Sequence, residues 1–143
     1  MKTTRISIAG CTLALLAFAL GCGASSKFEP VTGELVFPDG TPVSGLEGGQ
    51  VTFRQQSIGK EEVPVSASGS IDAQGKFSLA TEQLNDGAPI GTYDILIKVP
   101  EPSGDVPLPP VIHAKYGKFE TAGISQEVKE GTNHFKITVE PAR

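Results

Sequence analysis

The sequence predicts an all-β protein folded as a β-sandwich, and three observations support this prediction. Apolar and polar residues alternate with a period of two over much of the chain, as expected for strands that bury one face. No segment shows a convincing helical period of 3.6 residues. The 17 glycines and 11 prolines among 143 residues indicate many turns between short strands. Six or seven short strands separated by turns are typical of two packed sheets.

Seven segments carry the strand pattern, and residues that favour turns separate them. The clearest is 91–99, in which we expect Tyr93, Ile95, Ile97 and Val99 on the inner face, with Pro100 ending the strand. Some fifteen inward apolar side chains, at about 1.5–3 kcal/mol each, would form an adequate core without a disulfide. The predicted segments are 31–37, 51–56, 63–72, 77–79, 91–99, 124–128 and 134–140.

The turn between two of these strands is specific enough to predict in detail. Asp72-Ala73-Gln74-Gly75 lies between the apolar residues Ile71 and Phe77. This spacing favours a tight hairpin built on a type I turn, with Gly75 in the left-handed conformation as a bulge.

The first 21 residues have the pattern of a secretory signal peptide. Lys2 and Arg5 precede an apolar run at 6–20, which ends in Gly21. This run is too short, and too quickly followed by polar residues, for a typical transmembrane helix. We therefore expect export from the cytoplasm.

Residues 19–22, Ala-Leu-Gly-Cys, resemble the bacterial lipobox, although Ala19 stands where leucine is usual. The resemblance implies cleavage between Gly21 and Cys22 and attachment of diacylglycerol to the Cys22 thiol. Two or three acyl chains would then anchor the protein stably to a cell-envelope membrane, on its periplasmic side or at the cell surface. Residues 22–28 would form a lipidated tether. The alternative is an ordinary signal peptide cleaved nearby, with Cys22 as a free thiol.

The charge of the chain excludes some partners. Without residues 1–21, ten basic and sixteen acidic residues remain, a net charge of −6. Nucleic acid binding needs clustered Lys and Arg, which are missing from the sequence. The same balance disfavours electrostatic attraction to anionic lipids, so membrane attachment would be covalent or hydrophobic.

Residues 31–45, Val-Thr-Gly-Glu-Leu-Val-Phe-Pro-Asp-Gly-Thr-Pro-Val-Ser-Gly, resemble the opening of carboxypeptidase-regulatory-like domains, with V-x-G-x-V followed by D-G-x-P-V-x-G. Residues 71–77 are similar to the T-D-x-x-G-x-F hairpin of these domains. Residues 89–95 are similar to their x-P-G-x-Y-x-V strand entry, with Ile90 where proline is usual. The resemblance covers about 110 residues. It implies one domain, 29–143, folded as a seven-stranded Greek-key β-sandwich of the transthyretin-like (prealbumin-like) type. It says little about function, because this fold serves many binding and accessory roles.

The residues do not predict catalysis, a metal or a cofactor. His113 and His134 are about twenty residues apart and lack the spacing of zinc ligands. No serine lies in a G-x-S-x-G motif. Asp72-x-Gln74-Gly75 faintly resembles a calcium loop, but the predicted hairpin already accounts for each of these residues. We therefore expect a protein that is not an enzyme and has no cofactor.

The longest irregular segment, 100–118, is rich in proline. Its prolines favour an extended, polyproline-like path, and irregular loops of this length are often functional. We favour a crossover between the sheets, with Val111, Ile112 and Tyr116 packed on the edge of the sandwich. The alternative is a partner-binding loop that would use Pro107, Pro109, Pro110 and Tyr116.

These observations favour a membrane-anchored bacterial lipoprotein that acts as a binding or structural module of the cell envelope, with a protein or glycan partner. The alternative is a carrier of a small hydrophobic or glycan ligand in a cleft of the sandwich.

Overall fold

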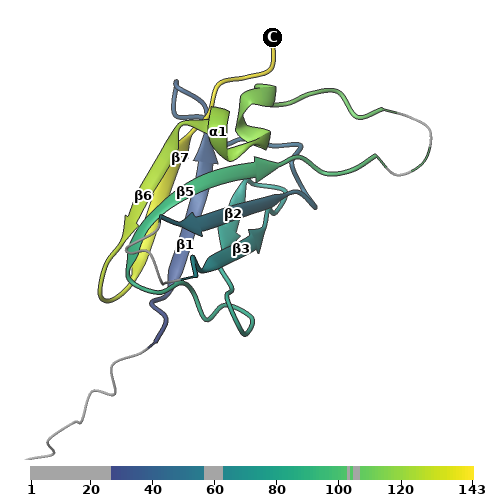
Figure 1. Cartoon of the computed structure of the whole chain (residues 1–143). Coiled ribbons are helices and arrows are strands. Elements are labelled where there is room, and N and C mark those ends of the chain that lie inside the picture. Colours follow the sequence, from purple (N-terminus) through teal and green to yellow (C-terminus); the bar gives the residue numbers. More distant parts are fainter. Residues whose placement is uncertain (1–26, 57–62, 103, 105–106) are drawn as a thin grey trace, which may run out of the picture.

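The computed structural model describes residues 27–56, 63–102, 104 and 107–143, and in these ranges it confirms an all-β sandwich (Figure 1). Two sheets face each other, and two short helical turns lie beside them. The strands are β1 (Val31–Val36), β2 (Gln50–Gln55), β3 (Ser66–Ser70), β4 (Lys76–Ser78), β5 (Gly91–Lys98), β6 (Ile124–Val128) and β7 (Asn133–Thr138). The helical turns are η1 (Ala114–Gly117) and α1 (Phe119–Ala122).

One sheet has the strand order β4-β1-β7 and the other β3-β2-β5-β6. In the first sheet β1 pairs antiparallel with β4 and parallel with β7, from Val31 opposite Asn133 to Val36 opposite Thr138. The strands of the second sheet are all antiparallel to their neighbours. The chain therefore passes from one sheet to the other after β1, β3, β4 and β6.

The core lies between the sheets, with Phe53 of β2 at its centre. Its ring centroid is 6.1 Å from that of Phe77 in β4 and 5.9 Å from that of Phe135 in β7. Tyr93 in β5 is 6.0 Å away on the same sheet as Phe53. These tilted aromatic contacts join both sheets, and aliphatic side chains such as Leu35 fill the space around them. The inward residues of the alternating pattern thus form one core.

The turn predicted at 72–75 forms, but it joins different sheets. Asp72 Oδ1 accepts hydrogen bonds from the backbone N–H groups of Gln74 (2.9 Å) and Lys76 (2.8 Å). Gly75 has φ 76°, the left-handed conformation predicted for it. β3 belongs to the four-stranded sheet and β4 to the three-stranded sheet, and the isolated bridge between Ser68 and Ala80 connects them. The turn is therefore a corner of the sandwich.

Several strands end earlier than predicted, β7 for example at Thr138 rather than at residue 140, and the differences at β3 and β5 each leave an apolar residue exposed. β3 begins at Ser66, and Val63 is exposed, because the pairing of β2 with β3 ends where Arg54 lies opposite Ser66. β5 ends at Lys98, opposite the first residue of β2, so Val99 has no partner strand and is exposed. The inward position predicted for Val99 was wrong.

The two helical turns were not predicted, because four residues each are too few to show a period of 3.6. They bury Tyr116 and Ala122 against the sandwich. The guanidinium carbon of Arg54 lies 3.8 Å from the ring centroid of Phe119, a cation–π contact that holds α1 beside the four-stranded sheet. Among the described residues, no helix is both long and apolar enough to cross a bilayer.

Candidate functional site

An apolar groove lies at the end of the sandwich where β5 stops, and we call it the proline-rich groove. Pro100, Pro102 and residues 107–112 form one wall, and the connection between β1 and β2 contributes the buried side chain of Leu46. Val99 and Leu108 stand at the groove with 51% and 49% of their surface exposed. The groove has a volume of about 260 Å³. Its prolines are Pro100, Pro102, Pro107, Pro109 and Pro110.

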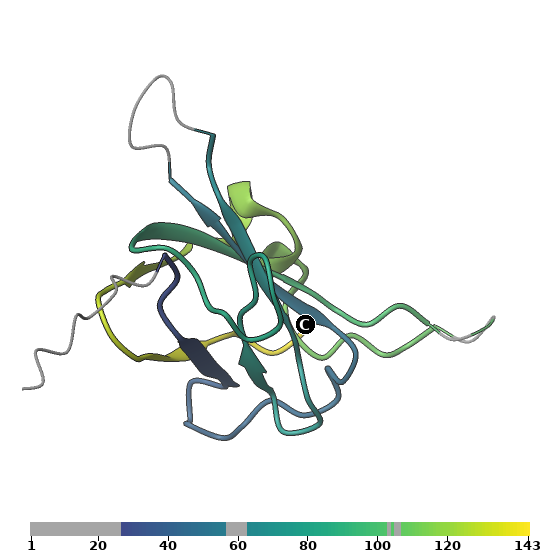
Figure 2. The same cartoon turned by 90° about the horizontal axis from the view of Figure 1, so that it is seen from below.

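Proline chemistry explains why this segment stands apart from the sheets. Pro100 follows β5 and cannot donate a ladder hydrogen bond, so pairing ends there. Residues 107–113 lead from the loop back to the sandwich, and we call them the returning limb. Pro107, Pro109 and Pro110 restrict φ in this limb, so it follows an extended path and loses little conformational entropy when it becomes ordered. The loop projects away from the body of the sandwich in both Figure 1 and Figure 2. A stiff apolar loop on a rigid base is suited to binding.

The returning limb of the loop is fastened to the C-terminal residues. Ile112 forms an isolated antiparallel bridge with Pro141. The His113 N–H donates to the carbonyl oxygen of Glu140 (3.0 Å), and the Ala142 N–H donates to the carbonyl oxygen of Val111 (3.1 Å). This short ladder fixes the base of the groove.

Side chains of η1 also hold the loop to the C-terminal residues. The Tyr116 hydroxyl oxygen accepts a hydrogen bond from the Glu140 N–H (2.9 Å). Lys115 Nζ lies 2.7 Å from Glu140 Oε1, and this hydrogen-bonded ion pair raises the pKa of Lys115 and lowers the pKa of Glu140. Because both side chains are partly exposed, the ion pair contributes little energy, and the buried Tyr116 ring is the main contact.

The structure separates the residues predicted for a partner-binding loop. Pro107, Pro109 and Pro110 line the groove and are exposed. Tyr116 is 4% exposed and lies in the core, so its ring is not available to a partner. Ile112 is buried beside it, as expected for a segment that packs on the edge of the sandwich. The predicted lipidation site, Gly21 and Cys22, lies outside the described residues.

Sequence reasoning missed three apolar residues of the groove. Val99 was predicted on the inner face of a strand, and neither Leu46 nor Leu108 was given a role. For Val99 the following proline was the available signal, because it ends the strand one residue early. Leu108 is a single large apolar residue among prolines, which indicates exposure rather than a core position.

The two histidines have structural partners. His113 caps η1, its Nδ1 atom accepting from the Lys115 N–H (3.1 Å). His134 lies on the exposed face of the three-stranded sheet, with Nδ1 3.0 Å from Thr32 Oγ1. In the described part of the chain, no three His, Cys, Asp or Glu side chains come together as a metal site. The proline-rich groove is therefore the site that the geometry supports best.

Fold and site together define a β-sandwich domain with an apolar groove at one end. No protein-family model matches this chain, and neither does any curated protein sequence. Among known structures it is similar to a 9R-lipoxygenase from Cyanothece PCC8801, with 12% sequence identity and a TM-score of 0.40. The match covers 96% of this chain but 18% of that protein. A likeness at this level carries no conclusion about function.

Proposed function

We propose that the chain is a lipid-anchored, non-enzymatic lipoprotein of the bacterial cell envelope that presents the proline-rich groove to a protein partner. The observation that carries this proposal is the position of the groove relative to the N-terminal entry. β1 and β7 run parallel, and the chain enters where Val31 pairs with Asn133. The groove lies beyond the other end of β7, where Ile112 bridges to Pro141 (Figures 1 and 2). A tether at Cys22 would hold one end near the membrane and leave the groove accessible.

The lining of the groove favours a protein over a glycan. Every side chain that lines it is apolar, whereas sugar recognition needs converging hydrogen-bonding groups. Its volume of about 260 Å³ is slightly below the roughly 300–1,000 Å³ usual for small-molecule pockets. This space suits one or two apolar side chains of a partner. The alternative, a carrier of a small hydrophobic ligand, is favoured by the same lining and would show as saturable binding of an apolar fluorescent probe that Leu108→Asp weakens.

The finer fold assignment is part of the proposal. We infer that the sandwich is a Greek-key fold of the transthyretin-like type found in carboxypeptidase-regulatory-like domains. The crossing of the chain between sheets after β1, β3, β4 and β6 supports this inference. So do the motif residues, since Asp72 and Gly75 form the expected turn. An experimental structure with a different strand order would contradict it.

The anchor is tested first, through Cys22. The full chain should acquire the mass of the lipid modification, lose residues 1–21 and partition into the detergent phase. Globomycin, which blocks lipoprotein signal peptidase, should leave an unprocessed precursor, and Cys22→Ala should abolish lipidation. An unchanged mass and unchanged partitioning under both treatments would refute the anchor.

The partner is tested by site-specific photo-cross-linking in cells. A photoreactive residue at Leu108 should give one dominant protein adduct, whereas the same residue at His134 should not give it, because His134 lies on an exposed sheet face away from the groove. Leu108→Asp should abolish capture of that partner in a pull-down. Equal adducts from both positions, or none from Leu108, would contradict the proposed role of the groove.

A further inference from the structure

A second hollow adjoins the proline-rich groove, where the end of β5 meets η1. Residues 97–99 of the β5 end and residues 112–114 of the returning limb and η1 line it. Its volume is about 290 Å³, and it shares Val99, Ile112 and Ala114 with the proline-rich groove. The two hollows are therefore continuous, and we call the second one the β5-end hollow.

The hydrogen-bond pattern of β5 shows which way its backbone groups point. β2 and β5 are antiparallel, and the Gln56 N–H donates to the carbonyl oxygen of Thr92 (2.8 Å). Because the direction alternates along a strand, the even-numbered residues of β5 bond to β2 and the odd-numbered residues face β6. β6 begins at Ile124, opposite Ile95. The next odd-numbered residue, Ile97, therefore points its N–H and carbonyl groups to a side where no strand pairs with it.

These backbone groups are buried and unpaired. Ile97 lines the β5-end hollow and is 1% exposed, so water has little access to its N–H and carbonyl groups. In the part of the chain that the structure describes, no residue forms a hydrogen bond with either group, or with the N–H of Val99. Buried backbone groups without a partner are rare, because each costs free energy. A bound segment in the β5-end hollow could supply the missing partners.

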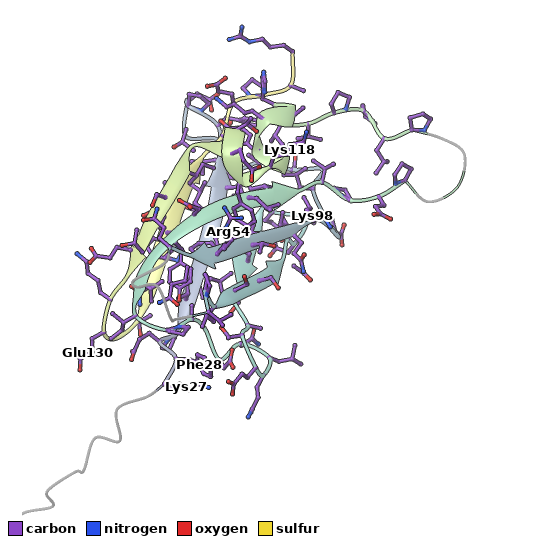
Figure 3. The ribbon with its side chains drawn as sticks, viewed as in Figure 1. Lys27, Phe28, Arg54, Lys98, Lys118 and Glu130 are labelled. Atoms are coloured by element: carbon purple, nitrogen blue, oxygen red, sulfur yellow. The ribbon has the colours of Figure 1, made fainter. Side chains whose placement is uncertain are left out.

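The charges around the two hollows favour a neutral or acidic segment. Lys98 lines the β5-end hollow, and no acidic side chain lines either of the two parts. Figure 3 labels Lys98 and Lys118 at this end of the molecule and Glu130 at the opposite end. Within the described ranges, neither lysine forms an ion pair. The acidic residues Glu47 and Glu101 line a separate hollow.

We propose that the partner binds through an extended segment, which enters the β5-end hollow as a β-strand, pairs with the end of β5 and directs alternate apolar side chains into the proline-rich groove. This inference rests on the proposed function and specifies the form of the partner's segment. Strand addition to an open sheet edge gives affinity through the main chain and specificity through pockets for alternate side chains. A helical segment would keep its own backbone hydrogen bonds and leave Ile97 unpaired.

The first test removes one backbone donor. The probe is a synthetic peptide with the sequence of the segment that a photoreactive residue at Leu108 captures, and its affinity is measured for the full chain, Val99→Pro and Val99→Ala. Both substitutions replace the valine side chain, but only proline removes the N–H. We expect Val99→Pro to bind the peptide about tenfold more weakly than Val99→Ala, the matched control, because one hydrogen bond to the peptide is lost. Urea unfolding of both variants checks that the fold is retained.

The second test needs no substitution and decides the matter if Val99→Pro does not fold. Amide hydrogen exchange is followed by NMR in the full chain, with and without the peptide. The Val99 amide proton should exchange at least about tenfold more slowly when the peptide is bound, because it gains an acceptor. The Leu108 amide lies at the groove but away from the β5 edge, so it is the internal control and should change little. Equal protection of both amides would contradict strand pairing.

Failure of the strand and failure of the groove are distinguishable. The absence of a dominant adduct from Leu108 refutes the proposed function, and the inference with it. A captured peptide that binds Val99→Pro and Val99→Ala equally, and leaves exchange at Val99 unchanged, refutes strand addition alone. A peptide that becomes helical on binding, measured by circular dichroism, also overturns the inference while leaving the groove as the binding site.

Discussion

At the scale of single residues, Gly69 shows how closely the two sheets approach each other. It lies in β3, and a Cβ atom at this position would overlap the backbone carbonyl of Ser78 in β4. The sheets therefore approach more closely here than any other residue type would allow. Because the obstructing atoms are backbone, a substitution cannot be relieved by a rotamer change.

Gly69→Ala should destabilise the fold by about 1–3 kcal/mol through overpacking. Gly117→Ala is the matched control, since nothing lies within 4 Å of a Cβ there and its φ is not positive. That change should be neutral or stabilise by up to about 1 kcal/mol, because alanine restricts the unfolded chain. Urea unfolding measures both, and equal stability of the two variants would contradict the close approach.

At the scale of elements, the loop 81–87 is organised by one carboxylate. Asp86 accepts hydrogen bonds from the N–H groups of Thr81 (2.6 Å), Glu82 (2.9 Å) and Gln83 (2.8 Å). Partial desolvation of Asp86 raises its pKa, but these hydrogen bonds outweigh it and hold the pKa below the ordinary 3.8. The loop that exposes Leu84 is thus ordered by its own backbone.

This lowered pKa predicts a pH dependence. The folded pKa of Asp86 lies below the unfolded one, so its contribution is present above pH 3.8 and is lost as the pH falls through the folded pKa. Asp86→Asn should lower the free energy of unfolding by about 1 kcal/mol at pH 7, because an amide NH₂ replaces one carboxylate oxygen and cannot accept from these N–H groups. The difference from wild type should shrink in acid. Glu101→Gln, in an exposed loop, should stay within about 0.5 kcal/mol of wild type at both pH values.

At the scale of the whole molecule, both sheets share one core. Leu35 in β1 is fully buried and belongs to the same apolar cluster as Phe53 in β2 and Ile95 in β5. The sequence after Cys22 contains no cysteine, so this core must stabilise the folded domain without a disulfide. The two sheets should therefore unfold as one unit.

Leu35→Ala should cost about 2–5 kcal/mol by leaving a cavity. Leu84→Ala, the same change at a residue 92% exposed, should stay within about 0.5 kcal/mol of wild type. Unfolding followed by circular dichroism and by tyrosine fluorescence should give coincident transitions in both variants. Separate transitions for the two sheets would contradict a shared core.

Much of the fold could be predicted from the sequence because a strand with one buried face shows a local alternation of apolar and polar residues. The alternation around Tyr93 and Ile95 defines β5, and Asp72 with Gly75 defines the tight turn at 72–75. Strand ends were less predictable. Whether Val63 or Val99 is paired depends on where the neighbouring strand ends, and the local alternation of residues does not indicate that position.

The candidate site was predicted in part. The prolines marked the segment, and Pro107, Pro109 and Pro110 do line the groove, whereas Tyr116 lies in the core. Leu46 joins the groove from a distant part of the chain, a contact that exists only when the chain has folded.

The sequence by itself determined the all-β class, the tight turn at 72–75 and the proline-rich segment, since each follows from residue types that restrict their own backbone, whereas that this turn joins two sheets came from the structure. The tertiary structure alone decided which ends of the strands share a surface. The parallel pairing of β1 with β7 places the chain entry at one end and the groove at the other. That separation arises because packing sets the contacts between residues far apart in sequence, and no short stretch of sequence specifies those contacts.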